Sequence, residues 1–265
     1  MRVLITGACG RIGSLLSERL AVRHQIRGLD IAAAPPDYPG EFITGDCADT
    51  AVADTAVSDT DAVVHLAGIA TEAGLLAILQ GHVIGTAALL DAMVQHDVRR
   101  MVFASSNHAV GMTPRPPSGV VGVDIPPRPD SFYGVGKVAG EALLSLYADR
   151  HGISSVALRI GSCRETPEVR RNLATWLSYD DCTAMVEAAL TAEFDGVRTI
   201  YGISANRDAW WDLEPGRAIG YHPQDDAADY EADLPTRDED EAEAARLGGP
   251  FALPEAARRP FSSDQ

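Results

Sequence analysis

An apolar run at the start of the chain leads directly into closely spaced glycines. VLITG (residues 3–7) is followed by ACGRIG, in which glycines recur at every third position ahead of a helical pattern over residues 11–23. Glycines between a strand and a helix allow a tight turn and let a pyrophosphate approach the helix N-terminus. They also occur at ordinary strand–helix turns, so the position directly after the opening strand is what favours a nucleotide site. That site would comprise Gly7, Gly10, Arg11, Ile12 and Gly13.

Apolar runs typical of buried strands alternate with helical patterns along the chain. We expect strands at residues 3–7, 25–30, 41–46, 61–68, 100–106, 154–161 and 198–204, and helices around 11–23, 72–96, 134–151, 168–176 and 180–193. This alternation predicts an α/β fold, a doubly wound, Rossmann-like parallel sheet with helices on both faces and right-handed crossovers. Residues 1–160 would form the nucleotide-binding region, and residues 161–265 a small C-terminal substrate-binding portion of the same domain.

Two further segments differ in composition from the rest. Residues 113–130 are rich in Pro and Gly and predict a long surface loop of the kind that often borders an active site. Residues 225–249 are strongly acidic and predict one or two solvated helices, not a binding tail.

Composition excludes several kinds of partner. The 265 residues include 38 acidic and 22 basic side chains, which gives a formal net charge of −16. Such a field repels nucleic acid and anionic membranes, so we expect neither as a partner, and an anionic substrate would need a local cation. No apolar run appears long enough to span a bilayer, and no signal peptide is recognisable. The four cysteines form no CxxC pair, so we expect free thiols, no metal site and a cytoplasmic protein.

An acidic residue at the end of the second expected strand indicates which nucleotide is bound. Asp30 stands where a carboxylate binds the adenosine ribose hydroxyls, and it would repel a 2′-phosphate. The next residues, IA, supply no cation for such a phosphate, so we expect NAD rather than NADP. Asp46 ends the third strand and either bonds the adenine or caps the loop. The remaining cofactor contacts are expected from Cys47, Leu66, Ala67 and Gly68.

The chain contains one lysine, Lys137, four residues after Tyr133. Side chains four apart on a helix share one face. A nearby ammonium stabilises a phenolate and lowers the pKa of the phenol from about 10, so that Tyr133 can take a hydroxyl proton while a hydride leaves the same carbon. A surface lysine is the alternative, but a chain with no other lysine favours the catalytic interpretation. Ser106, or its neighbour Ser105, follows the fifth strand and would position the substrate oxygen.

Longer segments extend the pattern. FASSNHAVG (103–111), PRPDSFYGVGK (127–137), LRIGSC (158–163), ATWLSYDD (174–181) and SANRDAWWD (204–212) accompany the glycines and Asp30. Together they resemble the uronate dehydrogenases, which belong to the extended, epimerase-like branch of the short-chain dehydrogenase/reductase superfamily. The resemblance runs from the N-terminus to about residue 225.

The resemblance implies a role for individual residues. Tyr133 would be the general base and Ser106 the catalytic serine. Lys137 would lower the pKa of Tyr133 and bind the ribose. The sugar pocket would be lined by Ser106, Asn107, His108, Ser162 and Arg171. Arg171 would hold the C6 carboxylate, for which guanidinium is suited; Arg170 and Arg164 are rivals for this role.

Two positions depart from the family pattern. Ala70 replaces a serine that contacts the sugar, and His82 replaces an asparagine in a helix. His82 would take over local backbone hydrogen bonding or alter a proton relay. These departures bear on the identity of the sugar.

These features predict an NAD-dependent oxidation of the anomeric carbon of a hexuronic acid, glucuronate or galacturonate, to an aldarolactone. Within the same class, a 1-dehydrogenase acting on a neutral aldose such as L-arabinose is the alternative. A nucleotide-sugar epimerase and a non-catalytic NAD-sensing module are alternatives from other classes. The superfamily resemblance also implies a homo-oligomer.

Overall fold

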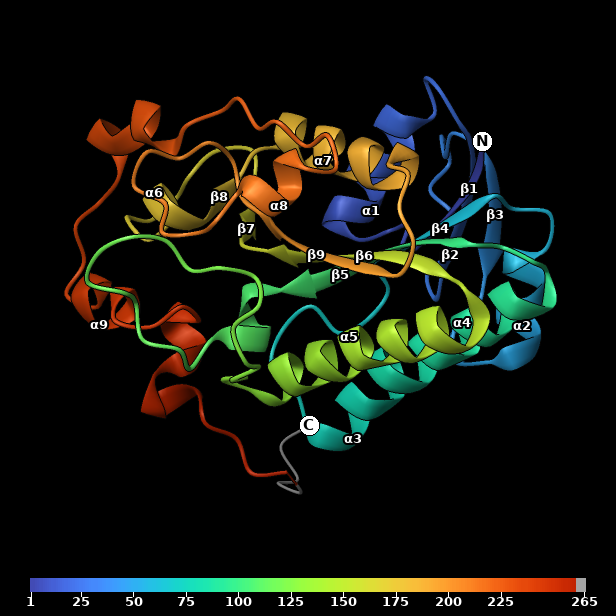
Figure 1. The fold of residues 1–265 in the computed structure, drawn as a ribbon, viewed down its shortest axis with the longest axis horizontal. Helices are drawn as coiled ribbons and strands as arrows, with labels where there is room; N and C mark the ends of the chain where they lie inside the picture. Colours follow the sequence, from blue (N-terminus) through green and yellow to red (C-terminus); the bar gives the residue numbers. More distant parts are fainter. Residues whose placement is uncertain (261–265) are drawn as a thin grey trace.

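Seven parallel strands form one central sheet in the structure, a computed structural model that describes residues 1–260 (Figure 1). Their order across the sheet is β3-β2-β1-β4-β5-β6-β9. The strands are β1 (Arg2–Thr6), β2 (Gln25–Asp30), β3 (Glu41–Thr44), β4 (Ala62–His65), β5 (Arg100–Ser106), β6 (Ser154–Ile160) and β9 (Val197–Gly202). The predicted doubly wound α/β fold is confirmed, and the order of the strands reverses beside β1, where such folds bind nucleotides.

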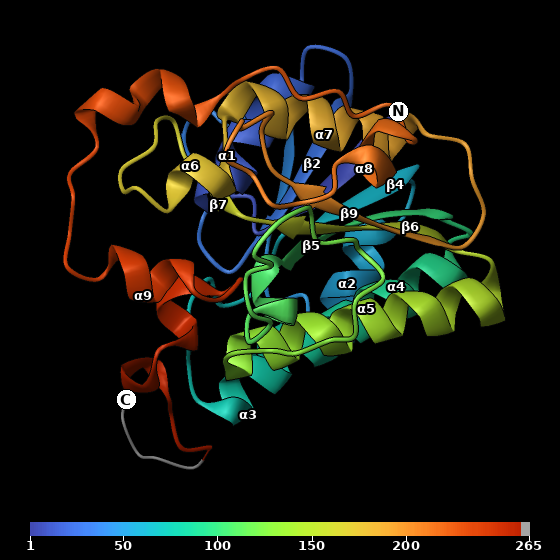
Figure 2. The same ribbon diagram turned by 60° about the vertical axis from the view of Figure 1, so that its left-hand side comes forward.

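Helices cover both faces of the sheet (Figures 1 and 2). One face carries α1 (Arg11–Leu20), α7 (Tyr179–Thr191) and α8 (Glu214–Arg217), and the other carries α2 (Thr50–Val57), α3 (Leu75–Ile78), the π-helical turn η1 (Leu79–Ile84), α4 (Gly85–Gln95) and α5 (Phe132–His151). The continuous helix Leu75–Gln95 is long and apolar enough to cross a membrane by composition alone. It nevertheless contributes Leu89, Leu90 and Met93 to the core, as expected of a core helix.

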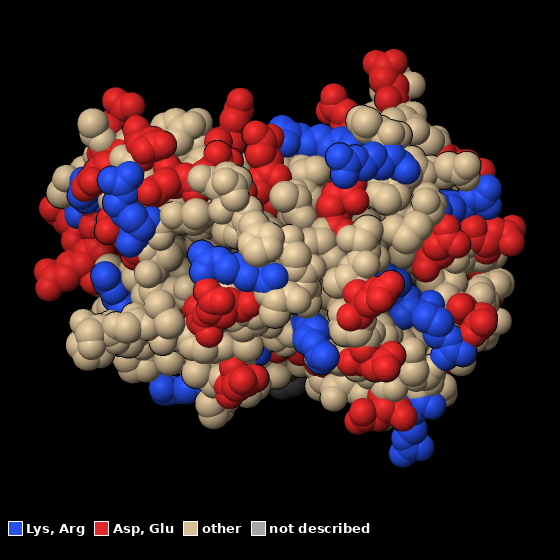
Figure 3. All heavy atoms as spheres, turned by 45° about the horizontal axis from the view of Figure 1, so that its top comes forward, with Lys and Arg blue, Asp and Glu red and all other residues tan. Residues whose placement is uncertain are grey.

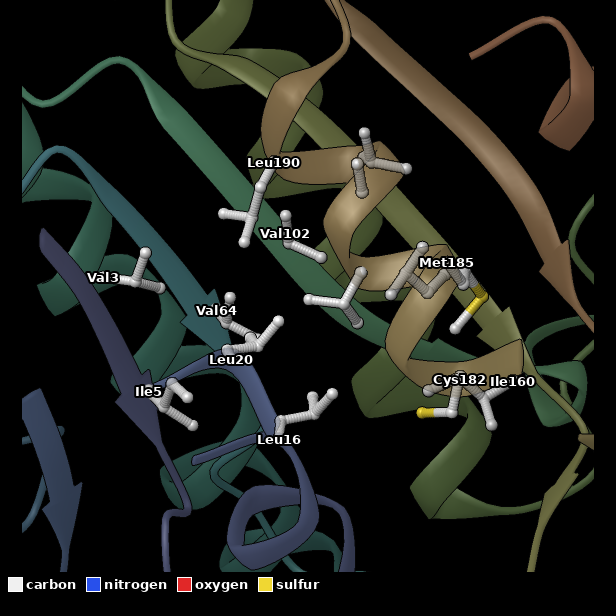
Figure 4. Packing of buried hydrophobic residues seen from close by; sticks show 14 of the residues in the cluster. Val3, Ile5, Leu16, Leu20, Val64, Val102, Ile160, Cys182, Met185 and Leu190 are labelled. Atoms are coloured by element: carbon white, nitrogen blue, oxygen red, sulfur yellow. The ribbon is translucent and has the colours of Figure 1, made fainter. Parts of the chain in front are cut away.

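The alternation of side chains along each strand divides the core into two layers. Val3 and Ile5 of β1 point toward α1 and α7, where they join Leu16, Leu20 and Met185 (Figure 4). Leu4 points to the opposite face and joins the cluster under α2, α4 and α5. A parallel sheet is buried on both faces, which explains why these strands read as continuous apolar runs.

The part of the C-terminal third outside β9, α7 and α8 lies beyond the carboxyl ends of the strands (Figure 1). It contains β7 (Ser162–Cys163), α6 (Asn172–Thr175), β8 (Trp176–Leu177) and α9 (Asp240–Ala244), and the 3-10 turns η3 (Ala227–Asp233), η4 (Gly249–Ala252) and η5 (Pro254–Ala256). Another 3-10 turn, η2 (Asn107–Val110), follows β5. Asp and Glu are abundant on the face shown in Figure 3, as the net charge requires.

The acidic segment differs from the solvated helices that its composition predicted. Most of its carboxylates are exposed, but Glu243 is buried beside Arg237, and Leu247 is fully buried. Figure 2 shows this part of the chain lying beside the segment that contains η2. The segment packs there because its backbone carbonyls accept hydrogen bonds from buried donors of the candidate site.

Gly13 allows the closest backbone approach in the glycine turn. A Cβ added there would lie 2.0 Å from the carbonyl oxygen of Gly7, whose φ is +68°. We predict that Gly13→Ala lowers the free energy of unfolding by about 1–3 kcal/mol through overpacking, measured by urea denaturation. Gly122→Ala is the control, because a Cβ there meets nothing within 4 Å. Equal stabilities for the two variants would contradict this account of the turn.

Candidate active site

A cavity of about 1030 Å³ opens at the carboxyl edge of the sheet. Its lining includes every residue that the sequence predicted for the site except Asn107 and Arg171. The predicted residues that line it are Gly7, Gly10, Arg11, Ile12, Gly13, Asp30, Asp46, Cys47, Leu66, Ala67, Gly68, Ser106, His108, Tyr133, Lys137 and Ser162. The fold therefore joins the two ends of the predicted site, one rich in glycine and one with titratable side chains, in a single space.

The glycine end fits a dinucleotide without a 2′-phosphate. Helix α1 begins after Gly10 with no side-chain cap, so its first amide groups remain available to an anion. The Asp30 carboxylate accepts hydrogen bonds from the backbone N–H of Cys9 at 2.9 Å and of Ala32 at 3.0 Å. Each oxygen keeps acceptor capacity for a ribose hydroxyl. Asp46 caps its own loop by accepting from Ala48 N at 2.9 Å, and it also lines the cavity.

Helix α5 brings Tyr133 and Lys137 to the other end of the cavity. Its N-terminus is capped twice: Ser131 Oγ accepts from Gly134 N at 3.1 Å, and the Glu72 carboxylate accepts from the N–H groups of Phe132 and Tyr133 at 3.1 and 2.8 Å. Glu72 thus ties the loop after β4 to the first turn of α5. No local sequence pattern points to Glu72, because the amide groups that it caps begin 60 residues away along the chain.

Lys137 is 4% exposed. Its Nζ lies 5.4 Å from the ring centroids of both Tyr133 and Phe103. Burial lowers the pKa of Lys137 to about 7, because the ammonium loses its hydration. The lysine is therefore not the surface side chain that was the alternative interpretation.

The pKa of Tyr133 is shifted in the direction opposite to the one that the sequence predicted. Burial raises the pKa of Tyr133 to about 12, a hydrogen bond with Ser106 lowers it, and the charge of Asp130 raises it. We expected the neighbouring ammonium to lower this pKa, but desolvation dominates in this structure. Lys137 is desolvated as well and so carries less charge near neutral pH.

The two adjacent serines at the end of β5 have different partners. Ser105 Oγ donates to Glu141 Oε1 at 2.5 Å, and Glu141 is paired with the buried Arg159. Ser106 Oγ accepts from the His108 N–H at 3.2 Å and donates to Asn107 Oδ1 at 3.3 Å, and its hydroxyl lowers the pKa of Tyr133. This geometry favours Ser106 as the serine that acts together with Tyr133.

His82 lies in the π-helical turn η1 and is 1% exposed. Its Nε2 lies 2.9 Å from the carbonyl oxygen of Ile69, and its ring meets that of Tyr133 edge-on at 5.5 Å. The hydrogen bond matches the first of the two roles that we considered, local backbone bonding in place of an asparagine. Burial lowers the pKa of His82 to about 4, so the ring is neutral at physiological pH.

Arg171 and Asn107 bind the C-terminal segment and do not line the cavity. Arg171 donates to the backbone carbonyls of Glu243 at 3.1 Å and Leu247, and Asn107 Nδ2 donates to the Leu247 carbonyl at 2.9 Å. Burial lowers the pKa of Arg171 to about 10, which still leaves it charged at neutral pH. Arg164 does line the cavity and is paired with Glu168 at 2.6 Å.

Comparison with known proteins places this geometry among NAD-dependent enzymes. Residues 3–164 match the model of the NAD dependent epimerase/dehydratase family. The uronate dehydrogenase of Pseudomonas putida is 38% identical over 258 residues, covering 95% of this chain and 96% of the relative. A crystal structure of a uronate dehydrogenase variant from Agrobacterium tumefaciens complexed with NAD superposes with a TM-score of 0.89 at 36% identity, covering 95% and 96% of the two chains.

The chain belongs to the uronate dehydrogenase family.

A further relative is named for a neutral sugar. The L-arabinose 1-dehydrogenase (NAD(P)(+)) of Haloferax volcanii is 36% identical over 252 residues, covering 86% of this chain and 98% of the relative. Relatives of similar sequence identity to this chain therefore bear names that refer to sugar acids and to a neutral sugar. The cofactor in the family is NAD, and the Asp30 end of the cavity fits it.

We predict that burial of the Lys137 ammonium lowers the free energy of unfolding of the protein. A neutral side chain at this position would not have this effect. In the unfolded chain a lysine titrates near ~10.4. The folded protein holds it with a pKa of about 7, so the unfolded chain binds the additional proton between these pH values. Lys137→Met should therefore be more stable than the parent near neutral pH, and the difference should shrink by about 1.4 kcal/mol per pH unit as the pH rises.

Denaturant titrations across this pH range measure the difference. Arg150→Met, at an exposed position near the end of the same helix, is the control and should show no such trend. A Lys137→Met difference that is independent of pH would contradict the assignment of a depressed lysine pKa.

Proposed function

We propose that the chain catalyses the NAD-dependent oxidation of the anomeric carbon of a hexuronic acid, glucuronate or galacturonate, to the aldarolactone. The observation that carries this proposal is the cluster of Ser106, Tyr133 and Lys137 at one end of a cavity whose other end presents Asp30. NAD, when bound, supplies the hydride acceptor.

In this proposal the protein side chains position the sugar and move its proton. Ser106, whose hydroxyl acts on the pKa of Tyr133 and lines the same cavity, orients the C1 hydroxyl beside the phenol. Tyr133 Oη takes the hydroxyl proton as the C1–H bond breaks with its electron pair, and C1 becomes the lactone carbonyl. Lys137 stabilises the phenolate form of Tyr133 that accepts this proton, and it binds ribose hydroxyls. Its compact ammonium suits a confined site better than the planar guanidinium of Arg.

The substrate end supports a sugar acid through its local cations. The net charge of −16 repels an anion at long range. Arg171, at the start of α6, shares the Leu247 carbonyl with Asn107, a residue proposed for the sugar pocket by family resemblance, and Arg164 lines the cavity. Ser162 and His108, which line the cavity, would bind sugar hydroxyls.

One specific observation favours a second candidate, a neutral aldose such as L-arabinose. The N–H donors of Arg171 already bind backbone carbonyls. Ala70 lines the cavity but, unlike the serine of the family pattern, has no hydroxyl group that could bond the sugar. The similarity to the Haloferax enzyme points the same way. A neutral aldose would be oxidised at C1 by the same Tyr133.

A substrate panel tests the proposed function. We predict NADH formation with glucuronate or galacturonate, and a kcat/KM at least about 10-fold lower with glucose and L-arabinose. Tyr133→Phe is the control and should lose about 100-fold or more in kcat. Turnover of neutral sugars as fast as uronates would favour the second candidate. An epimerase would yield no net NADH, and a sensing module would bind NADH without any turnover.

A pair of arginine variants tests the carboxylate assignment. If Arg171 binds the C6 carboxylate, Arg171→Ala should lower kcat/KM for a uronate by about 100-fold and leave the rate with a neutral aldose nearly unchanged. Arg164→Ala tests the rival cation that lines the cavity, and a loss confined to the uronate in this variant would move the assignment to Arg164. Equal losses for both substrates in Arg171→Ala would show that Arg171 acts only by holding the C-terminal segment.

We further infer a homo-oligomeric, cytoplasmic enzyme. Leu76, Ile84 and Leu146 on the α3–α4 and α5 helices are large apolar side chains that are 67%, 47% and 49% exposed in the single chain. A second copy packed on this surface would cover them. Light scattering on the purified protein measures the mass of the assembly.

A further inference from the structure

The His108 imidazole is held on several sides while it lines the cavity. Its Nδ1 lies 2.8 Å from Oδ2 of Asp130. The ring of Phe251 stacks on it at 4.3 Å with an interplanar angle of 26°, and the ring of Tyr133 meets it edge-on at 5.6 Å. These contacts fix the plane of the imidazole and the direction in which each nitrogen points.

Asp130 is fully buried, and its carboxylate is closely surrounded by neighbouring groups. Its side chain is 0% exposed, and its Oδ1 accepts a hydrogen bond from Ser131 Oγ at 2.7 Å. A Cβ added at Gly111 or at Gly248 would lie 1.8 or 1.7 Å from Oδ2. Glycine at both positions is what leaves space for the carboxylate, and Gly248 comes from the C-terminal segment.

The chemistry of the pair determines where the imidazole proton lies. An ionised carboxylate only accepts hydrogen bonds, so Nδ1 of His108 must donate. In the neutral imidazole the other nitrogen, Nε2, then carries a lone pair and no proton. A histidine without such a partner is free to carry its proton on either nitrogen.

We propose that Asp130 is a positioning residue that fixes the tautomer of His108, so that Nε2 accepts a hydrogen bond from a hydroxyl group of the bound sugar. The inference rests on the proposed function for the identity of the ligand. It makes the site selective for a hydroxyl donor: a sugar that lacks this hydroxyl, or carries it as a methyl ether, leaves a buried acceptor unpaired.

Asp130 also acts on its other neighbours through its charge. The titratable groups that face it are His108 from η2, Tyr133 from α5 and Arg171 from the start of α6. The negative charge raises the pKa of Tyr133. The tautomer and the charge are separable, because asparagine keeps an acceptor oxygen for Nδ1–H and loses the charge.

A double-mutant cycle between Asp130→Ala and His108→Ala tests the proposal, with the sugar that the panel shows to be turned over. We expect Asp130→Ala to raise KM by about 10-fold, equivalent to one lost hydrogen bond of about 1.4 kcal/mol. In the His108→Ala background the same substitution should change KM by less than about 2-fold. NADH affinity, measured by fluorescence titration, should stay unchanged. An equal KM increase in both backgrounds would overturn the proposal, because Asp130 would then act independently of His108.

The tautomer itself is observable without any substrate. Nitrogen-15 NMR of the histidine side chains at about pH 8, where an ordinary imidazole is neutral, should show His108 protonated at Nδ1 in the parent and at Nε2 in a substantial fraction of Asp130→Ala. A parent His108 protonated at Nε2 would overturn the proposal. This result does not depend on which sugar is oxidised, so it distinguishes failure of the tautomer model from failure of the proposed function.

Asp130→Asn separates the effect of the charge. We expect it to keep the Nδ1–H form and a KM within about 3-fold of the parent, since the amide oxygen replaces the lost acceptor. Its pH–rate profile should move to lower pH, because the Tyr133 pKa falls when the charge is removed. A KM as high as that of Asp130→Ala, with the proton still on Nδ1, would overturn the link between tautomer and binding.

Discussion

Lys137 places an ammonium group between the rings of Tyr133 and Phe103, where only 4% of the residue is exposed. Helix α5 can approach β5 and η1 this closely because its facing positions are glycines. A Cβ at Gly140 would lie 2.3 Å from the Phe103 ring, and one at Gly136 would lie 2.7 Å from Ile78. The glycines allow α5 to pack closely, and the burial of Lys137 in this packing lowers its pKa.

A second desolvated cation organises the substrate end. Arg171 is satisfied by backbone carbonyls of the C-terminal segment, and this holds Leu247 and Gly248 against the site. The same segment places Phe251 on the face of His108. The cofactor end of the cavity therefore comes from the first strands and turns, whereas the C-terminal segment supports the other end through Phe251 and Leu247 without lining the cavity.

The sequence predicted best where a few neighbouring residues carry the chemistry. The glycine turn, Asp30 and the Tyr133–Lys137 spacing are local patterns, and the structure brings them to one cavity. It predicted less where a partner is distant. Glu72 caps the helix of Tyr133 from another loop, and the acidic segment proved to be partly buried. The sequence also predicted a lowered pKa for Tyr133, whereas burial in the fold raises it. The size of this effect depends on how much water the fold removes from the phenol.

The sequence by itself determined the class of fold, the cofactor and the residues that meet at the catalytic end, because alternation of apolar runs and motif spacing act within one or two turns of chain. Only the tertiary structure decided that Ser106 rather than Ser105 faces Tyr133, and that Asp130 holds His108. Hydrogen-bond partners and desolvation depend on contacts between segments far apart in the chain, which no local pattern specifies.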